Sequence, residues 1–385
     1  MEVEILTKRN NRGLNPSQAN QKILIAMAGG RCQFKGCGKK LFQNEDTLTK
    51  GNFSNMAHII ASSPDGPRGN EESHDLSADI NNIILLCPQH HKEVDTHKEK
   101  YPADVLKEMK VYQEKKVDEL LNGLCYSTME RIQFTSPIKG TSKVAIDDYL
   151  TIEALRSINR NPSHPEPIKI DIESTGGYGS KNYWKNSVDQ LMNKYKTIIR
   201  PYFNHPDTAF AIFPIAPIPL IAKLGELFGD KVPVEIFQKF RTPNTWEWRS
   251  KERCNSFTLE RLTRADGNIF KVAIILSLTS EIAEERVLKV YNPGIIYVLH
   301  ADKIGVDCIS SLEDLSAFWH KYQEICDRIK NKDQLSEAAV FPAVPVSAAF
   351  EIGRRYMPGA YPILTLYDED DGFFETLKIG GKSDE

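Results

Sequence analysis

The hydrophobic and polar positions divide the chain into two parts with different patterns. In the N-terminal third, apolar runs over 53–61 and 82–86 predict strands, and amphipathic stretches over 16–27 and 102–121 predict helices. From residue 168 onward, apolar runs alternate with amphipathic stretches. The expected strands are 168–173, 208–214, 234–237, 271–277, 295–299 and 363–367, and the expected helices are 184–199, 219–227, 311–330 and 347–356. This alternation predicts an α/β fold class with largely parallel sheets.

One motif recurs in the second part at a constant offset of 128 positions. Phe213, Pro214, Pro217 and Gly225 are matched by Phe341, Pro342, Pro345 and Gly353. Four matches in one register predict two related strand–turn–helix units, although chance agreement in a proline-rich chain is the alternative. Two such units would form a pseudo-twofold cleft at the carboxyl ends of their strands, where open α/β sheets usually bind ligands.

The composition is that of a soluble globular protein with two domains. The 385 residues are 41% hydrophobic and 26% charged, and they exceed what one ordinary core holds. The longest apolar run, 209–222, is short for a membrane span and contains three prolines, so we expect no membrane association. The acidic N-terminus lacks a signal-peptide core, and seven cysteines without a secretion signal indicate reduced thiols in a cytoplasmic protein.

Charge is distributed unevenly along the chain. The net charge is −3, yet residues 1–40 hold eight basic side chains against two acidic ones. The eight are Lys8, Arg9, Arg12, Lys22, Arg31, Lys35, Lys39 and Lys40. Such a basic patch would favour contacts with phosphate groups. The alternative is a solvated, partly flexible N-terminal segment.

Four residues have the type and spacing of ligands for a structural zinc ion. Cys32 and Cys37 form one pair. Cys87 and His90 form the second pair, which begins 50 positions after Cys37. Two such pairs predict a closed tetrahedral site, and four unrelated buried residues are the alternative. The zinc would hold the cysteine knuckle against the turn at Cys87, because this small lobe has little core of its own.

The same stretch carries three further polar residues in a recognisable arrangement. They stand in Ala57-His58-Ile59 and in Asn82-Ile-Ile-Leu-Leu-Cys87-Pro-Gln-His90-His91. Residues 30–97 thereby resemble the zinc-stabilised ββα-metal fold of HNH nucleases. The resemblance implies a metal-dependent endonuclease that hydrolyses phosphodiesters and leaves a 5′-phosphate.

The resemblance also implies a catalytic role for each of these residues. His58 would be the general base, and His91 would hold one divalent cation, magnesium or manganese. Asn82 would hydrogen-bond across the hairpin and keep the His58 segment in place. Many HNH proteins have a metal ligand just before the base, where this chain has Ala57. Asp95, on the same helix face as His91, is therefore our candidate for the second protein ligand.

The second part of the chain resembles a SAVED domain over about residues 130–385. The segments that carry this resemblance are 210–225, 246–248 and 340–353. It implies two fused Rossmann-like (CARF-like) halves that sense a cyclic di- or trinucleotide. An HNH–SAVED fusion resembles the effectors of bacterial cyclic-oligonucleotide antiphage systems (CBASS). In those effectors, ligand binding drives the association of protomers and switches on degradation of double-stranded DNA. The resemblance therefore implies that this chain forms a homo-oligomer (dimer or tetramer) on activation.

The expected ligand site is less sharply marked than the nuclease motif. Glycines in the segment 174–180 would let backbone N–H groups approach a phosphate, and aromatic rings would stack on bases. The candidates are Gly176, Gly177, Tyr178, Pro217, Trp246, Trp248 and Pro345. A plain flexible loop is the alternative for the glycines, and core packing is the alternative for the tryptophan pair.

These features give a domain assignment and leave two rival functions open. The expected domains are an HNH endonuclease over 1–122, a connection over 123–143 and a SAVED sensor over 144–385. The first rival is a modification-dependent restriction endonuclease whose C-terminal domain reads DNA. The second is a non-catalytic, zinc-stabilised DNA-binding protein, which the joint presence of His58, Asn82 and His91 disfavours.

Overall fold

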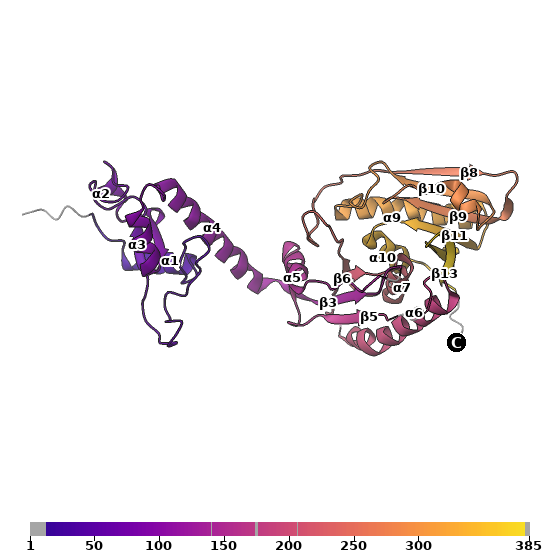
Figure 1. The fold of residues 1–385 in the computed structure, drawn as a ribbon, viewed down its shortest axis with the longest axis horizontal. Coiled ribbons are helices and arrows are strands. Elements are labelled where there is room, and N and C mark those ends of the chain that lie inside the picture. Colours follow the sequence, from indigo (N-terminus) through magenta and orange to yellow (C-terminus); the bar gives the residue numbers. More distant parts are fainter. Residues whose placement is uncertain (1–12, 140, 174–175, 206, 382–385) are drawn as a thin grey trace, which may run out of the picture. The chain divides into compact units, whose positions relative to one another are not determined.

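The computed structural model describes residues 13–139, 141–173, 176–205 and 207–381, and the chain forms two compact units, 1–125 and 126–385 (Figure 1). The basic residues Lys8, Arg9 and Arg12 lie outside the described residues. None of the helices in the described part of the chain is both long and apolar enough to cross a membrane.

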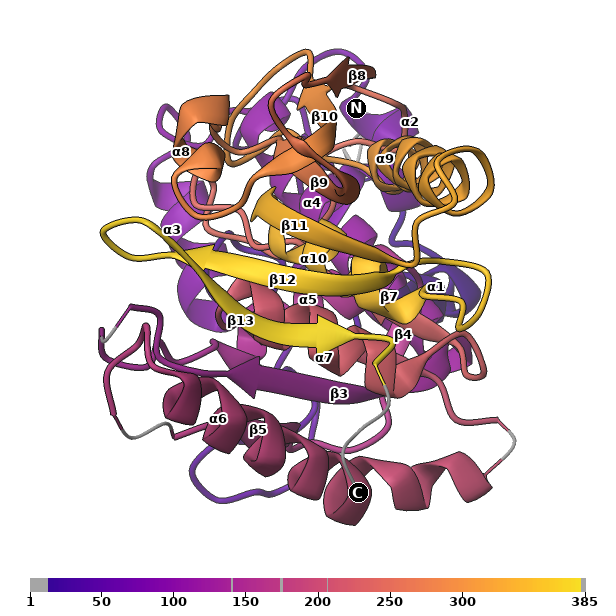
Figure 2. The same ribbon diagram turned by 90° about the vertical axis from the view of Figure 1, so that its right-hand side faces the viewer.

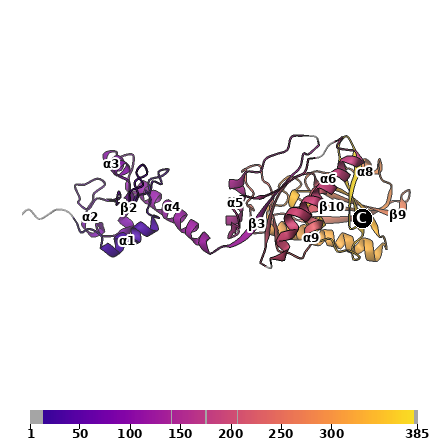
Figure 3. The ribbon, with the colours of Figure 1, turned by 90° about the horizontal axis from the view of Figure 1, so that it is seen from below.

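The N-terminal unit contains a short hairpin surrounded by helices. Its elements are α1 Gln18–Met27, β1 Asn55–His58, α2 Ser73–Leu76, β2 Ile83–Leu86, α3 Pro88–Thr96 and α4 Ala103–Asn122. β1 and β2 pair antiparallel with His58 opposite Ile83, and α1, α3 and α4 all contact β2 (Figure 3). β2 is buried along its whole length, so the core of this unit is centred on one four-residue strand.

The cysteine knuckle docks onto β2 through one buried glutamine. The Gln33 backbone N–H donates to the Leu85 carbonyl at 2.8 Å, and the Gln33 side-chain oxygen accepts from the Leu85 N–H at 2.7 Å. The Gln33 side chain also donates to Glu114 of α4 at 3.0 Å, and Glu114 pairs with the buried Lys110. These contacts join the knuckle, β2 and α4.

The first half of the C-terminal unit is a parallel sheet with helices. Its elements are β3 Ser127–Thr135, α5 Asp148–Ser157, β4 Arg160–Pro162, β5 Ile168–Asp171, α6 Lys181–Lys194, β6 Phe210–Ile215, α7 Ile218–Phe228 and β7 Val234–Ile236. The strand order is β4-β3-β6-β7, with β5 also paired to β3, and every pair is parallel. A π-helical turn, Tyr195–Ile199, extends α6.

β3 lies inside the interval 123–143, which the sequence predicted to be a connection. The strand was missed because its buried side chains include polar ones. Arg131 is 2% exposed and Gln133 is 4% exposed. Both donate to the Asp148 carboxylate, at 3.3 and 2.7 Å, so polar side chains that resemble those of a surface segment find partners within the fold.

The second half is a larger sheet with antiparallel edges. Its elements are β8 Phe257–Thr263, β9 Asn268–Ser277, α8 Glu284–Leu288, β10 Pro293–Ala301, α9 Leu312–Asp327, β11 Glu337–Ala343, α10 Val346–Arg354, β12 Ile363–Glu369 and β13 Phe373–Ile379. The order is β13-β12-β11-β9-β10-β8 (Figure 2). The four inner strands are parallel, and β8 and β13 pair antiparallel at the edges.

The 128-residue offset corresponds to two equivalent strand–helix units that meet at their helices. α7 begins at Ile218 after β6, and α10 begins at Val346 after β11. A Cβ on Gly353 would lie 1.7 Å from the Ala222 carbonyl oxygen, and one on Gly225 would lie 2.1 Å from that of Phe350. α7 and α10 therefore cross with their backbones in contact, and only glycine fits at either place. The internal repeat is confirmed.

Candidate functional site

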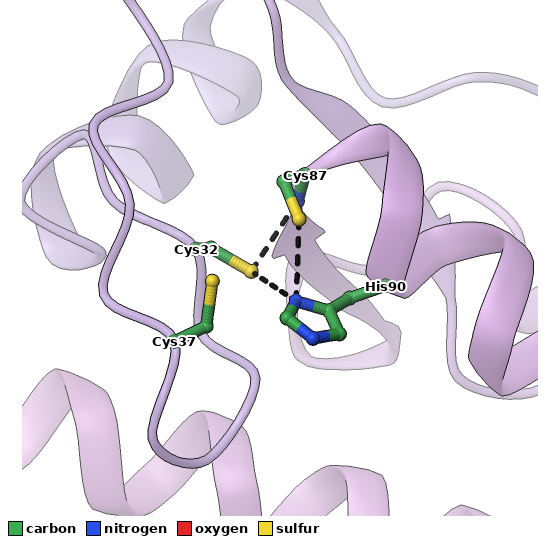
Figure 4. A group of neighbouring side chains, drawn as sticks. All are labelled: Cys32, Cys37, Cys87 and His90. Atoms are coloured by element: carbon green, nitrogen blue, oxygen red, sulfur yellow. Dashed lines mark hydrogen bonds between the residues drawn. The ribbon is translucent and has the colours of Figure 1, made fainter. Parts of the chain in front are cut away.

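The four expected zinc ligands converge in the N-terminal unit (Figure 4). The ligand atoms of Cys32, Cys37, Cys87 and His90 all lie within 4.8 Å of one another. His90 Nδ1 is 3.2 Å from the Cys87 sulfur and 3.7 Å from the Cys32 sulfur. Zinc–sulfur and zinc–nitrogen bonds of tetrahedral sites place neighbouring ligands about 3.5–3.8 Å apart. The donor set and its spacing therefore fit a zinc ion.

Local structure presents these ligands to one another. Cys87 precedes α3, Pro88 starts the helix, and His90 lies in its first turn. The His90 ring stacks on Phe34 with a centroid distance of 4.0 Å, which fixes the direction of Nδ1. The Cys87 backbone N–H donates to the Cys32 sulfur at 3.3 Å. Such N–H···S contacts stabilise a thiolate.

Electrostatics in the cluster also suit a cation. Burial, supported by the neighbouring Cys87 and Cys37, raises the pKa of Cys32 to about 12. Burial and then the charge of Lys39 lower the pKa of His90, which favours the neutral imidazole that ligates metals. A bound divalent ion would supply the charge that lets the buried thiols ionise.

A second feature of this unit is a pocket of about 600 Å³ that His58, His91 and Asp95 line together. The remaining lining residues are Gly13, Asn15, Met56, Ala61, Ser62, Ser63, Gly66 and Pro67. The structure thus brings the expected base and the expected cation ligands into one cavity. His74 and His97 do not line it.

β1 directs His58 into this pocket and Ala57 into the core. Ala57 is 1% exposed, so the position before the expected base faces away from the cavity. His58 Nε2 lies 3.0 Å from the Ser77 carbonyl oxygen. Because a carbonyl only accepts hydrogen bonds, Nε2 carries the proton, and Nδ1 of the neutral ring holds a free lone pair.

Asn82 lies behind the pocket and is 3% exposed. Its amide donates to the carbonyls of Ile60 at 2.8 Å and Leu76 at 3.2 Å, and its oxygen accepts from the Ile60 N–H at 2.8 Å. Asn82 therefore hydrogen-bonds to the chain that leaves β1, two residues after His58, and the positioning role that the resemblance implies for it stays a prediction. It ends a 3₁₀ turn, Ile80–Asn82, rather than starting β2.

The Asp95 carboxylate contacts both His91 and Arg68. His91 Nε2 lies 3.3 Å from one Asp95 carboxylate oxygen, and the Arg68 guanidinium lies 2.8 Å from the other. Although burial opposes the shift, hydrogen bonds from His91 and Arg68 lower the pKa of Asp95. Sequence reasoning missed Arg68, because one arginine in a loop rich in Ser, Pro and Gly carries no local signal.

In the C-terminal unit, the structure places two candidate stacking residues in the core. Trp246 is 1% exposed and packs edge-on against Phe213, so it offers no ring face to a ligand, which corrects the role expected for it. Tyr178 is 7% exposed and donates to Asp368 at 2.5 Å. Its ring is therefore a packing element that links the loop after β5 to β12, and the stacking role expected for it is corrected too.

The other candidates of the C-terminal unit are divided between surface and interior. Gly176 and Gly177 are exposed, while Ser174 and Thr175 lie outside the described residues. Trp248 is half-buried, edge-on to Phe240. Pro217 and Pro345 are buried at equivalent positions, each just before α7 or α10.

A polar contact not suggested by the sequence joins the two halves near the carboxyl ends of the strands. The buried Gln238, which follows β7, accepts hydrogen bonds from the Ser347 hydroxyl at 2.9 Å and the Ser347 N–H at 3.2 Å. The sequence predicted a cleft at the carboxyl ends of the strands. A cavity of about 540 Å³ lies toward the opposite, amino ends of β9 and β11, where Lys271 and Glu337 line it.

Comparisons with known proteins bear on the C-terminal unit. Residues 191–379 match the family model described as SAVED, the SMODS-associated sensor domain fused to various effectors. The match begins within α6 and ends with the last residue of β13. No match to this chain was found among curated proteins.

Solved structures similar to this chain include three structures of two SAVED/CARF-domain receptors. The Cap4 receptor of Acinetobacter baumannii with the cyclic trinucleotide 2′3′3′-cAAA is 14% identical, with 81% of this chain and 67% of that chain covered and a TM-score of 0.44. The same receptor is similar in its structure without a named ligand, at a TM-score of 0.42. Cap4 of Moraxella osloensis is 13% identical, with 80% and 65% covered and a TM-score of 0.41. Within the C-terminal unit, residues 191–379 are therefore similar to the SAVED family of sensor domains.

Proposed function

We propose that this chain is an effector DNA endonuclease that a cyclic di- or trinucleotide activates through the SAVED domain. In this proposal the N-terminal unit is an HNH-type nuclease domain that degrades double-stranded DNA in antiphage defence. The observation that carries the proposal is the pocket shared by His58, His91 and Asp95, with the buried Asn82 holding the strand end behind it.

The hydrogen bonds of His58 suit the role of general base. Nε2 is tied to the Ser77 carbonyl, so Nδ1 is the nitrogen that would accept a proton from the attacking water. The water oxygen then bonds to phosphorus while the bond between phosphorus and the 3′ oxygen breaks, which leaves a 5′-phosphate. The fixed tautomer means that no proton rearrangement in the ring precedes this step.

His91 and Asp95 fit a hard divalent cation, magnesium or manganese. Two neighbouring ligands of an octahedral magnesium ion lie about 3.0 Å apart for bonds of about 2.1 Å. The 3.3 Å between His91 Nε2 and the Asp95 oxygen is close to that spacing. When bound, the cation would polarise the scissile phosphate and stabilise the leaving oxygen.

The zinc cluster would act as structural support in this proposal. His90 and His91 are adjacent on α3, so one faces the sulfur ligands and the other faces the pocket. The exposed cations on the knuckle, Arg31, Lys35, Lys39 and Lys40, would favour approach of the DNA backbone.

The SAVED domain supports a cyclic oligonucleotide as the activating ligand. Gly176 and Gly177 are our candidates for phosphate contacts, because both are exposed and no atom of the described residues lies within 4 Å of a Cβ built on Gly177. Pro217, Pro345 and Trp248 stay in the proposed site as residues that shape it. Binding would favour a dimer or tetramer that brings two nuclease pockets to one duplex, provided the ligand prefers the assembled state.

Replacement of the proposed base tests the catalytic assignment. His58→Ala should abolish magnesium-dependent cleavage of a plasmid, while zinc content and the circular dichroism spectrum stay unchanged. His97→Ala is the matched control, because the His97 side chain is 55% exposed and lies outside the pocket. Cleavage by His58→Ala at the wild-type rate would remove His58 from the mechanism.

Assembly is tested separately by light scattering. The activating nucleotide should increase both the particle mass and the cleavage rate. Full activation without any change in mass would refute assembly as the switch and leave the catalytic assignment standing.

A further inference from the structure

Arg68 makes an unusual set of contacts for a loop residue. Its side chain is only 6% exposed, and all three of its nitrogens donate hydrogen bonds. Nε donates to the Ile59 carbonyl at 2.6 Å and Nη1 to the Val94 carbonyl at 2.7 Å. Nη2 donates to the Asp95 carboxylate at 2.8 Å and lies 3.4 Å from the His58 carbonyl oxygen.

The carbonyl groups of Ile59 and Val94 lie at the ends of secondary-structure elements, where regular backbone hydrogen bonds stop. β1 ends at His58, so the Ile59 carbonyl lies beyond the strand ladder. Val94 lies in the last turn of α3, where helix carbonyls lack intrahelical donors. A cation at this place also suits the negative end of the helix dipole. One guanidinium therefore joins the end of the strand that carries His58 to the end of the helix that carries His91.

The loop is shaped to deliver this side chain. Arg68 has a φ of +58°, a left-handed conformation that costs energy for any residue with a Cβ. The loop closes tightly around it, with the Ala61 N–H donating to the Pro67 carbonyl and the Gly69 N–H to the Gly66 carbonyl. Such an unfavourable backbone conformation persists only where surrounding contacts require it.

We propose that Arg68 is a positioning residue of the nuclease pocket. It fixes the separation of the His58 and His91 backbones, and it holds one oxygen of Asp95 so that the other faces the cation together with His91. The proposal rests on the proposed function and adds a residue to it. Arg68 itself does not line the pocket, so it acts through Asp95 and the two backbones.

The test is Arg68→Lys in the full-length protein, with Arg31→Lys as the matched control. Lysine keeps the charge, but one ammonium cannot reproduce the planar set of donors. Arg31 is exposed and lies outside the pocket. The first readout is manganese binding by electron paramagnetic resonance without DNA, beside the zinc content. Substitutions behind a metal ligand typically weaken binding about 10–100-fold.

We expect that loss for Arg68→Lys, with zinc retained, and none for Arg31→Lys. Unchanged manganese affinity in Arg68→Lys would overturn the inference, even if cleavage proceeds as proposed. If Arg68→Lys binds manganese more weakly but the wild-type protein never cuts DNA, the positioning role of Arg68 is upheld and the proposed nuclease function is refuted. Manganese that fails to bind the wild type would refute both.

A double-mutant cycle separates an effect of Arg68 through Asp95 from an independent effect on manganese binding. Asp95→Asn keeps the shape of the side chain and removes its charge. If Arg68 acts through Asp95, the double variant should bind manganese no more weakly than the weaker single variant. Losses that multiply would show two independent effects and would overturn the inference.

Discussion

Asn82 allows the most quantitative prediction about the nuclease pocket. Asn82→Ala removes three hydrogen bonds, two to the Ile60 backbone and one to the Leu76 carbonyl. A typical intramolecular hydrogen bond contributes about 1 kcal/mol net, so the three together stabilise the strand end by about 3 kcal/mol. Ile60 is 8% exposed, so water does not easily replace these partners. About 3 kcal/mol corresponds to roughly a hundredfold change in the local opening equilibrium.

Hydrogen exchange measured by mass spectrometry tests this number. The peptide that contains residues 57–62 should exchange roughly a hundredfold faster in zinc-loaded Asn82→Ala than in wild type. The matched control is Asn81→Ala, because Asn81 is exposed and its side chain donates to Asp79 rather than to the strand. Equal protection in both variants would refute the reasoning that Asn82 holds the His58 segment. We also expect plasmid cleavage to fall in Asn82→Ala alone.

Three further predictions concern the metal, the helix crossing and one buried carboxyl group. Cys37→Ser should lose zinc and make the N-terminal unit sensitive to limited proteolysis, because zinc binding contributes much of the folding energy of small domains. Gly353→Ala should lower the melting temperature, since its methyl group would overlap the Ala222 carbonyl oxygen. Gly177→Ala should not, because none of the atoms that the structure describes lies within 4 Å of a Cβ at that position. Burial raises the pKa of Asp368 to about 6, above its ordinary value of 3.8. Because ionisation then opposes folding as pH rises through that range, Asp368→Asn should raise the melting temperature at pH 8 and not at pH 4.

The parts of the fold that were predictable are those with local signals. The four cysteine and histidine residues that could bind zinc come as two short-range pairs, and each pair is positioned by its own turn, so their spacing alone predicted the cluster. The repeat was visible because glycine is required twice at the same point of a helix crossing. Apolar runs that alternate with amphipathic stretches in the C-terminal unit indicated largely parallel sheets. This signal is also local, because a buried parallel strand is a continuous apolar run.

The parts that were missed depend on contacts between distant residues. β3 has polar side chains that are buried because later residues, chiefly Asp148 of α5, accept their hydrogen bonds. Trp246 is in the core because it packs edge-on against Phe213, and sequence spacing does not distinguish a core tryptophan from one that stacks on a ligand. Arg68 is tied to acceptors 9 to 27 positions away, so no neighbouring pattern marks it.

The central claim is that a nucleotide bound by the SAVED domain switches on hydrolysis of DNA by the N-terminal unit. Its most direct test is cleavage of supercoiled plasmid with magnesium across a panel of cyclic di- and trinucleotides. We predict that cleavage starts with at least one cyclic nucleotide and is absent without it. Cleavage at the same rate with no nucleotide, or cleavage that depends on modified bases in the plasmid, would contradict this account.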